Sequence, residues 1–364
     1  MKSGKRIIMA GGGTGGHIFP AIAIANALKA VDASVEILFV GAKGKMEMEK
    51  VPQAGYKIEG LTIAGFNRSS LFKNIALPFK LMKSFIQVSG IFSRFKPDAV
   101  VGVGGYSSFP VLKYAQVKRL PTFIHEANSY GGKSNILLAK KATAIFTATD
   151  GMEKFFPADK IIVSGNPVRQ AILHSNISKD EGCRKFGLDP NRKVILFVGG
   201  SLGARSINEA VDKGLDEMTN VGLQVIWQTG KPYRERGEER GRNRDGVFVN
   251  EFISAMEYAY AAADIVVSRS GAMALSELCV VKKPAILVPF PFAAEDHQTA
   301  NAQNLAKRQA AIVVKDEEAK DKLVKVVKDL TNDFNRQIEL SKNISNLAVI
   351  NADKIVAEEI LNRI

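Results

Sequence analysis

Short runs of apolar residues alternate with helix-like segments along most of this 364-residue chain, and this alternation limits the folds that it can adopt. The apolar runs of the first half predict buried strands over residues 6–10, 35–40, 99–103, 122–125 and 144–147. Helical segments, such as residues 20–29 and 134–140, follow them. Strands that alternate with helices form βαβ units whose strands run parallel. The sequence therefore predicts an α/β fold.

The alternation pauses at a turn-rich segment, Ser164-Gly165-Asn166-Pro167, and then begins again. In the second half the predicted strands cover residues 194–198, 224–228, 247–250, 265–268 and 285–288. The chain is long enough for two domains of about 150 residues each. We therefore predict two doubly wound domains of similar size that join near residue 165, and an amphipathic segment that closes the chain.

The composition excludes several classes of protein. Apolar residues make up 46% of the chain and charged residues 24%, which excludes a disordered or collagen-like chain. Two cysteines are too few for a disulfide framework and favour a reducing compartment. No apolar run reaches the ~18 residues that span a bilayer, so we expect a cytosolic or peripheral protein. The net charge of +13 indicates an acidic partner, namely nucleic acid, anionic lipid or a phosphorylated substrate.

Two glycine-rich loops occupy matching places in the two halves. The first covers residues 11–17 (GGGTGGH) and the second residues 199–204 (GGSLGA), each after a predicted strand and before a helix. Backbone N–H groups of such a loop can approach a phosphate, and the N-terminus of the following helix favours negative charge. The alternative is a pair of tight turns that need positive φ angles, and the repetition in both halves favours phosphate binding.

The first loop also fits the dinucleotide-binding pattern G-x-G-x-x-G through Gly11, Gly13 and Gly16. That pattern requires an acidic residue at the end of the second strand to hold the ribose. Here the second strand ends at Gly41 without a carboxylate, and Glu36 lies inside the strand. An NAD-dependent dehydrogenase is therefore the weaker interpretation.

Polar residues follow other predicted strands, where ligands bind in open parallel sheets. These segments cover residues 102–108, 125–128, 268–277 and 289–301. The chain has no Asp-X-Asp pair for a metal-bound diphosphate and no Cys/His cluster, so we expect no metal site and no cofactor. Helix N-termini, loop amides and Arg169 are expected to balance the charge of a diphosphate.

The segment between Glu59 and Asp98 contains no acidic residue. It holds six basic residues and six phenylalanines, namely Arg68, Lys73, Lys80, Lys83, Arg94 and Lys96, and Phe66, Phe72, Phe79, Phe85, Phe92 and Phe95. This mixture fits an anionic membrane surface, where each cation adds ~1 kcal/mol. The alternative is a helix that packs its aromatic residues into the first domain. We expect no nucleic-acid partner, because no known recognition motif occurs.

Six motifs follow one another between residue 7 and about residue 310. They are GGGTGGH (11–17), GVGGY (102–106), HEAN (125–128), GNPVR (165–169), GGSLGAR (199–205) and SRSGA (268–272). In this combination the chain resembles the MurG family of bacterial N-acetylglucosaminyltransferases, within glycosyltransferase family 28. The resemblance implies a GT-B fold with two Rossmann-like domains that face a cleft. Residues 1–165, joined by a C-terminal helix (350–364), would bind acceptor and membrane, and residues 166–349 would bind UDP-GlcNAc.

The resemblance also implies the reaction. N-acetylglucosamine would pass from UDP-GlcNAc, with inversion, to the C4 hydroxyl of undecaprenyl-diphosphoryl-N-acetylmuramoyl-pentapeptide. This step converts lipid I to lipid II in peptidoglycan synthesis, on which the cell wall, cell shape and cell division depend. The enzyme would be a peripheral protein at the cytoplasmic face of the cell membrane. A sugar-nucleotide 2-epimerase, which shares the fold and the donor, is another class to distinguish.

By motif position, the resemblance places the donor mainly against the second domain. Arg169 and Ser201 would face the diphosphate, Ile253 the uracil, Glu277 the ribose hydroxyls and Gln298 the sugar. A helix N-terminus would lie at the phosphates, over Ala272, Met273, Ala274, Leu275 and Ser276.

The first domain would approach the sugar and the acceptor. The residues implied at the sugar are Thr14, Gly15, Gly16 and Asn128. The acceptor diphosphate would meet Gly15 and the loop of Gly104, Gly105 and Tyr106. The chain departs from the family at three positions, because the family often has Gln where this chain has Ala127 and Leu202, and Thr where it has Ala274.

An inverting displacement needs a base that takes the proton of the acceptor hydroxyl. His17, at the mouth of the first loop, is the candidate catalytic base, because imidazole titrates near neutrality. Its alternative role is that of a helix-capping or phosphate-binding donor. His125 and Glu126 are the other candidates, and His174 lies outside every motif.

Overall fold

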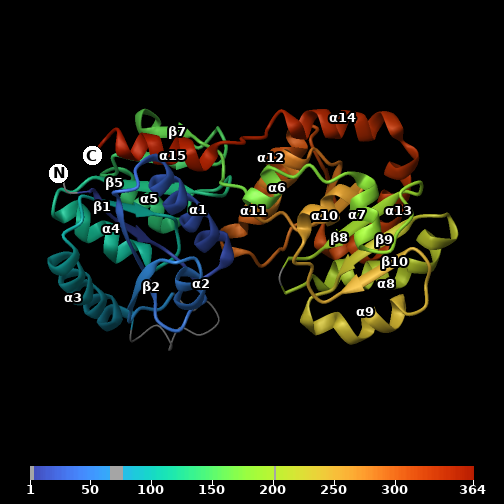
Figure 1. The fold of residues 1–364 in the computed structure, drawn as a ribbon, viewed down its shortest axis with the longest axis horizontal. Coiled ribbons are helices and arrows are strands. Elements are labelled where there is room, and N and C mark those ends of the chain that lie inside the picture. Colours follow the sequence, from blue (N-terminus) through green and yellow to red (C-terminus); the bar gives the residue numbers. More distant parts are fainter. Residues whose placement is uncertain (1–3, 66–76, 201) are drawn as a thin grey trace. The chain divides into compact units, whose positions relative to one another are not determined.

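The computed structural model describes residues 4–65, 77–200 and 202–364 (Figure 1). The chain divides into two compact units. The first domain comprises Met1–Val168 together with Asn351–Ile364, and the second domain comprises Arg169–Ile350. The division follows Val168 and thus lies three residues beyond the boundary predicted near residue 165. Every helix in the described part of the chain is too short or too polar to cross a membrane.

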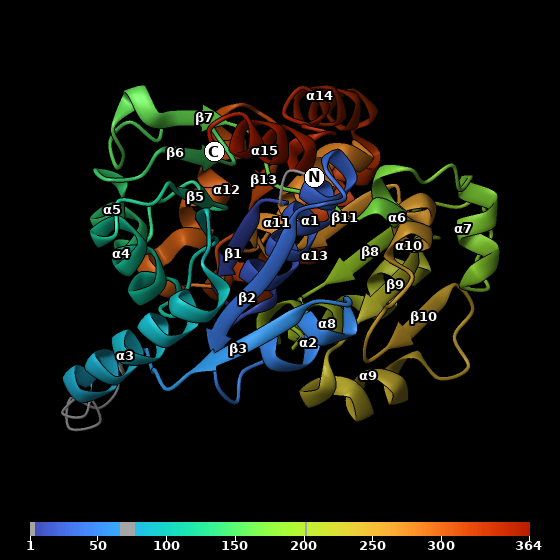
Figure 2. The same cartoon turned by 60° about the vertical axis from the view of Figure 1, so that its left-hand side comes forward.

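The first domain is built on a seven-stranded parallel sheet of order β3-β2-β1-β4-β5-β6-β7 (Figure 2). The strands are β1 (Arg6–Ala10), β2 (Glu36–Ala42), β3 (Lys57–Leu61), β4 (Ala99–Gly102), β5 (Thr122–Glu126), β6 (Ala144–Thr147) and β7 (Ile161–Val163). The helices are α1 (Gly15–Val31), α2 (Glu47–Gln53), α3 (Leu77–Phe95), α4 (Ser108–Val117), α5 (Lys133–Ala139) and α15 (Ala352–Leu361).

Both faces of this sheet are buried, which explains why its strands are continuous apolar runs in the sequence. Ile7 and Met9 of β1 belong to the core on one face, and Ile8 belongs to the core on the other. The last helix, α15, packs against α1 and adds Val356 and Ile360 to the first of these cores. The end of the chain is therefore part of the first domain.

The second domain repeats the plan with a six-stranded parallel sheet of order β10-β9-β8-β11-β12-β13. The strands are β8 (Val194–Val198), β9 (Gln224–Gln228), β10 (Val247–Asn250), β11 (Ile265–Ser268), β12 (Ala285–Leu287) and β13 (Ile312–Val313). The helices are α6 (Gln170–Leu173), α7 (Lys179–Lys185), α8 (Arg205–Asn220), α9 (Arg234–Gly241), α10 (Met256–Ala262), α11 (Ala272–Val281), α12 (His297–Lys307), α13 (Asp316–Asn332) and α14 (Phe334–Ser345).

The predicted fold class is confirmed, because each half forms a parallel sheet covered by helices. Every predicted strand is present, with ends that differ by at most two residues. The sequence missed β3, β7 and β13, all of which are short edge strands. Edge strands are less completely buried, so polar residues such as Lys57 and Glu59 interrupt their apolar pattern.

The start of α1 was predicted wrongly. The helix begins at Gly15, five residues before the predicted start at Pro20, which instead lies inside it. Thr14 is the N-cap residue in an extended conformation, with φ −144° and ψ 158°. Glycine's poor helix propensity hid this start in the sequence. Gly16 and His17 therefore lie in the first helical turn rather than in a loop.

The strand orders place the glycine-rich loops at special points of both sheets. The order reverses between β1 and β4 in the first domain and between β8 and β11 in the second. Ligands of open α/β sheets bind at the carboxyl ends of the strands beside such a reversal. The loops after β1, β4, β8 and β11 are therefore the places where this fold offers binding sites.

Candidate functional site

The loop that follows β1 is held by a buried carboxylate that the sequence did not reveal as a site residue. Glu47, in the first turn of α2, is 1% exposed. Its Oε2 accepts the N–H of Gly13 across 2.8 Å, and its Oε1 accepts the N–H of Ala42 across 2.9 Å. A bound dinucleotide would need loop amides such as that of Gly13 for its pyrophosphate. The carboxylate thus argues further against the dehydrogenase interpretation.

His17 lies between this loop and the loop that follows β4. Its Nδ1 lies 3.0 Å from the carbonyl oxygen of Gly12. A carbonyl oxygen only accepts hydrogen bonds, so Nδ1 carries the proton and Nε2 is the acceptor nitrogen of the neutral ring. A Cβ atom placed on Gly104 would lie 2.9 Å from that Nε2. The structure therefore brings His17 together with the loop of Gly104, Gly105 and Tyr106.

The two loops of the first domain pack backbone against backbone. A Cβ atom on Gly105 would lie 2.5 Å from the carbonyl oxygen of Gly12, and Gly105 has a φ angle of 81°, so glycine is needed there on both counts. The ring of Tyr106 lies close to Gly13 and Gly65. Burial and the negative charge of Glu47 raise the pKa of Tyr106, so its hydroxyl stays protonated at neutral pH.

The two other base candidates are built into the interior. His125 is 1% exposed, and its Nε2 lies 3.4 Å from the carbonyl oxygen of Gly165. Burial lowers the pKa of His125 to about 4, although the Gly165 carbonyl opposes the shift and His17 adds to it. Glu126 accepts hydrogen bonds from Asn128, Gly132 and Asn135 and so organises its loop. His174 is exposed at the end of α6.

Asn128 is one of the predicted sugar contacts, and Glu126 holds it in place. Its backbone N–H and its side-chain amide donate to Oε1 of Glu126 across 3.2 and 3.3 Å. Thr14 and Gly16, the other predicted contacts beside Gly15, are exposed at the start of α1. The first domain therefore presents these residues from the ends of β1 and β5.

The second glycine-rich loop, after β8, is held by a neutral side chain. Gln228, at the end of β9, donates through Nε2 to the carbonyl oxygen of Gly200 across 2.9 Å. Its Oε1 accepts the N–H of Ile253, also across 2.9 Å. Gln228 thus ties the loop to the residue predicted to contact uracil. The predicted Ser201 lies outside the described residues.

The helix that follows β11 begins without a side-chain cap. Gly271 is the N-cap residue of α11, and it has an extended backbone and no side-chain hydrogen bond to the helix. Ala272, Met273 and Ala274 are half-buried in the first turn, and Leu275 is buried. The hydroxyl of Ser276 donates back to the carbonyl of Ala272 across 3.0 Å. The backbone, rather than these side chains, is what this turn offers to a phosphate.

Two residues predicted to contact different parts of the donor are paired with each other. Arg169 donates through Nε and Nη2 to the two carboxyl oxygens of Glu277, across 2.6 and 2.9 Å. The hydroxyl of Tyr260 donates to Oε2 of Glu277 across 3.1 Å. The side chain of Arg169 is 46% exposed and that of Glu277 only 7%. Burial disfavours the charged Arg169, but Glu277 outweighs this effect and raises its pKa.

Gln298, the predicted sugar contact at the start of α12, holds the loop after β12. Its Oε1 accepts the N–H of Phe290 across 3.0 Å. Its carbonyl oxygen accepts the hydroxyl of Ser270 across 2.8 Å, and Asn301 donates to the carbonyl of Ser270 across 3.1 Å. The SRSGA motif and the segment over residues 289–301 therefore form one connected unit.

Both halves of the chain are similar to known protein domains. Residues 7–147 match the glycosyltransferase family 28 N-terminal domain, and residues 194–356 match the glycosyltransferase family 28 C-terminal domain. The chain belongs to glycosyltransferase family 28. The resemblance seen in the sequence is thereby confirmed.

Family 28 relatives match nearly the whole chain. A protein of Phocaeicola vulgatus is 51% identical over 99% of this chain and 96% of its own length. One of Bacteroides fragilis is 50% identical over 98% of this chain and 95% of its own length. Both are named UDP-N-acetylglucosamine--N-acetylmuramyl-(pentapeptide) pyrophosphoryl-undecaprenol N-acetylglucosamine transferase. The crystal structure of Acinetobacter baumannii MurG is similar, with a TM-score of 0.81, 28% identity and coverage of 98% of this chain and 99% of that one.

The three departures from the family 28 motifs have different structural settings. Ala127 is buried, and its carbonyl oxygen accepts a hydrogen bond from Asn166 across 3.0 Å. Leu202 is 78% exposed in the second glycine-rich loop, and Ala274 is half-buried in α11. None of the three side chains can form a hydrogen bond, so any contact with a substrate there runs through the backbone.

The predicted membrane segment forms α3 in its described part, while residues 66–76 lie outside the described residues. Phe79, Met82 and Ile86 are 69%, 60% and 69% exposed. Phe92 is buried in the core, and Phe85 and Phe95 are half-buried. Arg94 pairs with Glu59 across 2.8 Å. The described part of the segment therefore packs some of its aromatic residues into the first domain and leaves other apolar side chains exposed.

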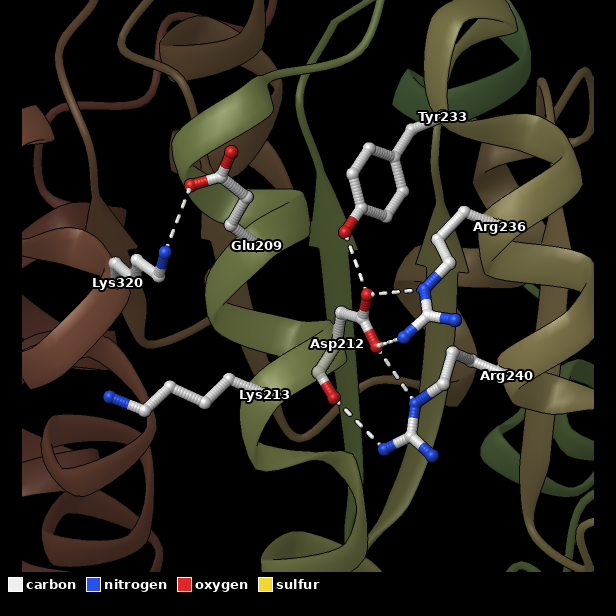
Figure 3. Close-up of a pocket in the computed structure, with 7 residues that line it drawn as sticks. All are labelled: Glu209, Asp212, Lys213, Tyr233, Arg236, Arg240 and Lys320. Carbon is white, nitrogen blue, oxygen red and sulfur yellow. Dashed lines mark hydrogen bonds and ion pairs between the residues drawn. The ribbon is translucent and has the colours of Figure 1, made fainter.

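The second domain also carries a pocket away from the predicted residues, with a volume of about 420 Å³ (Figure 3). Its lining residues are Glu209, Asp212, Lys213, Tyr233, Arg236, Arg240 and Lys320. Asp212 accepts from Tyr233 and pairs with Arg236 and Arg240. Four basic side chains and two carboxylates line the pocket, so its lining carries a net positive charge. In the described parts of both domains, no group of three or more His, Cys, Asp or Glu side chains is arranged to hold a metal ion.

Proposed function

We propose that this chain transfers N-acetylglucosamine from UDP-GlcNAc to the C4 hydroxyl of lipid-linked N-acetylmuramoyl-pentapeptide, and so makes lipid II from lipid I in peptidoglycan synthesis. The observation that carries this proposal is the identity of about one half, over nearly the full length, to relatives whose names state that transfer. The arrangement at the sheet reversals supports it, because one domain presents an imidazole and the other a helix N-terminus, a cation and a carboxylate.

On the donor side, the backbone amides at the start of α11 would hold the diphosphate of UDP-GlcNAc. Arg169 would turn from Glu277 to a phosphate oxygen, and Glu277 would accept hydrogen bonds from the ribose hydroxyls. Because the N–H of Ile253 already donates to Gln228, uracil would meet the carbonyl of Ile253. Gln298 would contact the sugar.

On the acceptor side, His17 would take the proton. The C4 hydroxyl oxygen forms a bond to the anomeric carbon of N-acetylglucosamine while its proton passes to Nε2 of His17. The bond from the anomeric carbon to the diphosphate breaks, and UDP leaves with the electron pair. Attack opposite to the leaving group inverts the configuration and gives a β-1,4 link. Gly15, Gly104, Gly105 and Tyr106 would lie at the acceptor diphosphate.

Transfer of label tests this function. The protein is incubated with radiolabelled UDP-GlcNAc and a lipid-linked muramoyl-pentapeptide, and we expect label in the lipid fraction and an equal amount of UDP. A 2-epimerase would instead convert UDP-GlcNAc without any acceptor. Conversion of the donor that does not depend on the acceptor, with no label in lipid, would refute the transferase.

We further propose that α3 carries the protein to the anionic cytoplasmic face of the cell membrane. The support is the exposed apolar row of Phe79, Met82 and Ile86 beside Lys80 and Lys83. Each cation contributes ~1 kcal/mol near anionic lipid, so Lys80→Glu with Lys83→Glu should reduce vesicle binding well over tenfold.

The vesicle experiment measures sedimentation with vesicles of phosphatidylglycerol and phosphatidylcholine. The matched control is Lys320→Glu with Lys322→Glu, the same change of charge on exposed positions of α13. We expect the control to keep vesicle binding. Equal loss in both variants would show that only net charge matters, and would refute a specific role for α3.

A further inference from the structure

We propose that Glu47 is a positioning residue for His17 and acts on it through the peptide group that joins Gly12 to Gly13. The inference rests on the proposed function, in which His17 takes the proton of the acceptor hydroxyl. It concerns a buried carboxylate that none of the sequence motifs contains.

The two ends of one peptide group connect the two side chains. At one end, the N–H of Gly13 donates to Oε2 of Glu47 across 2.8 Å. At the other end, the carbonyl oxygen of Gly12 lies 3.0 Å from Nδ1 of His17. The carboxylate, the peptide and the imidazole therefore form one continuous chain of hydrogen bonds. Members of such a chain polarise one another, so the charge of Glu47 makes the Gly12 carbonyl a stronger acceptor.

The surroundings of the carboxylate are shaped to hold it in this place. A Cβ atom on Gly12 would lie 2.2 Å from Oε1 of Glu47, and a Cβ atom on Gly41 would lie 2.5 Å from its Cγ. Oε1 also accepts the N–H of Ala42, at the end of β2. Glu47 is 1% exposed, so water does not screen its charge from the peptide. Both glycines thus make room for a carboxylate whose two oxygens are anchored.

This chain of hydrogen bonds gives His17 the form that a base requires. Donation from Nδ1 to the Gly12 carbonyl fixes the tautomer in which Nε2 is the acceptor nitrogen. It also fixes the orientation of the ring, with Nε2 toward Gly104. When Nε2 takes a proton, the positive charge of the imidazolium is stabilised through the polarised peptide. Glu47 thereby prepares His17 without touching a substrate.

The tautomer of His17 is the first test, and it uses the unmodified protein. Nitrogen-15 NMR of histidine-labelled protein distinguishes the two tautomers, and the label covers only four residues, His17, His125, His174 and His297. His17→Gln identifies the signal. We expect the form with the proton on Nδ1, and Glu47→Gln should shift the population toward the form with the proton on Nε2. An Nε2–H form in the wild-type protein would overturn the proposal.

A double-mutant cycle is the second test. Glu47→Gln should lower kcat about tenfold, as expected for a weakened hydrogen bond to a charged group, while the KM for UDP-GlcNAc stays unchanged. In a His17→Ala background the same substitution should change kcat less than twofold, because nothing remains for it to position. The control is Glu49→Gln, on the same helix, whose side chain is 66% exposed, and it should have no effect.

The outcomes separate the proposal from the function on which it rests. A tenfold loss from Glu47→Gln in both backgrounds would mean that Glu47 only supports the loop, and would overturn the relay. Full activity of His17→Ala would refute the role of His17 itself, and absence of transfer in the wild-type protein would refute the function. If Glu47→Gln fails to fold in a thermal melt, the wild-type tautomer decides the proposal.

Discussion

The two glycine-rich loops occupy the same place in their sheets, yet different groups hold them. The first loop is held by the carboxylate of Glu47, which accepts a hydrogen bond from the N–H of Gly13. The second loop is held by the neutral amide of Gln228, which donates a hydrogen bond to the carbonyl oxygen of Gly200. In the first loop a negatively charged side chain therefore binds a backbone N–H group. In the second loop an uncharged side chain binds a backbone carbonyl group.

This difference indicates how one fold serves two chemical tasks. The carboxylate behind the first loop accepts the N–H of Gly13, so that amide is not available to a phosphate. The same carboxylate holds the peptide group whose carbonyl oxygen lies 3.0 Å from Nδ1 of His17. In its described part the second loop is held by the neutral Gln228, and α11 begins at Gly271 without a side-chain cap. We infer that the first domain accepts the proton of the acceptor hydroxyl, whereas the second domain binds the donor nucleotide.

The largest expected effect comes from removing the imidazole of His17 in the first domain. His17→Ala should lower turnover by about 10²–10⁴, the usual loss when a general base is removed. Steady-state kinetics with saturating donor and acceptor measure this effect. If turnover persists and only the affinity for the lipid-linked acceptor falls, His17 is a ligand of the acceptor diphosphate. Another group must then be the general base.

A buried histidine of the first domain should make stability depend on pH. Burial lowers the pKa of His125 to about 4, below the ~6.5 of an exposed imidazole. As pH falls below 6.5, the unfolded chain binds a proton at His125 before the folded protein does. The contribution of His125 to the free energy of unfolding is therefore fully present above pH 6.5 and is lost between pH 6.5 and 4. At pH 5 the loss should be about 2 kcal/mol.

Urea denaturation at pH 7 and pH 5 measures this change in the free energy of unfolding. His125→Gln should show a smaller decrease between the two pH values than the wild-type protein, whatever its stability at pH 7. The same decrease in both proteins would assign the pH dependence to other groups.

The matching experiment in the second domain removes a carboxylate. Glu277→Ala should weaken UDP binding about ten- to a hundredfold, since hydrogen bonds to a charged group contribute ~1.5–3 kcal/mol. Tyr260→Phe, which removes only a donor to Glu277, should weaken binding less. Fluorescence competition with a UDP analogue measures both. A Glu277→Ala protein with wild-type affinity would remove Glu277 from the donor site.

The sequence predicted the fold because its signals are local. Buried strands of a parallel sheet are apolar on both faces, so runs such as residues 194–198 stand out by themselves. The loops at the sheet reversals were found for the same reason, because glycines after a strand are visible in the sequence. Edge strands such as Ile312–Val313 were missed, since two residues are too few to form a pattern.

The partners of the site residues were not predictable, because they depend on the folded chain. Glu47 lies 34 positions from Gly13, and Glu277 lies 108 positions from Arg169. Nothing local to either carboxylate marks its partner. Gln228 was passed over as the last residue of a strand. The sequence therefore indicated the loops that lie at the sheet reversals, but left open which groups hold these loops in place.

Calorimetric titration with UDP of the wild-type, His17→Ala and Glu277→Ala proteins in one buffer tests the division of tasks most directly. The account predicts that His17→Ala binds UDP within a few-fold of the wild-type affinity, whereas Glu277→Ala binds at least tenfold more weakly. If His17→Ala weakens UDP binding as much as Glu277→Ala does, both domains hold the nucleotide and the proposed division is wrong.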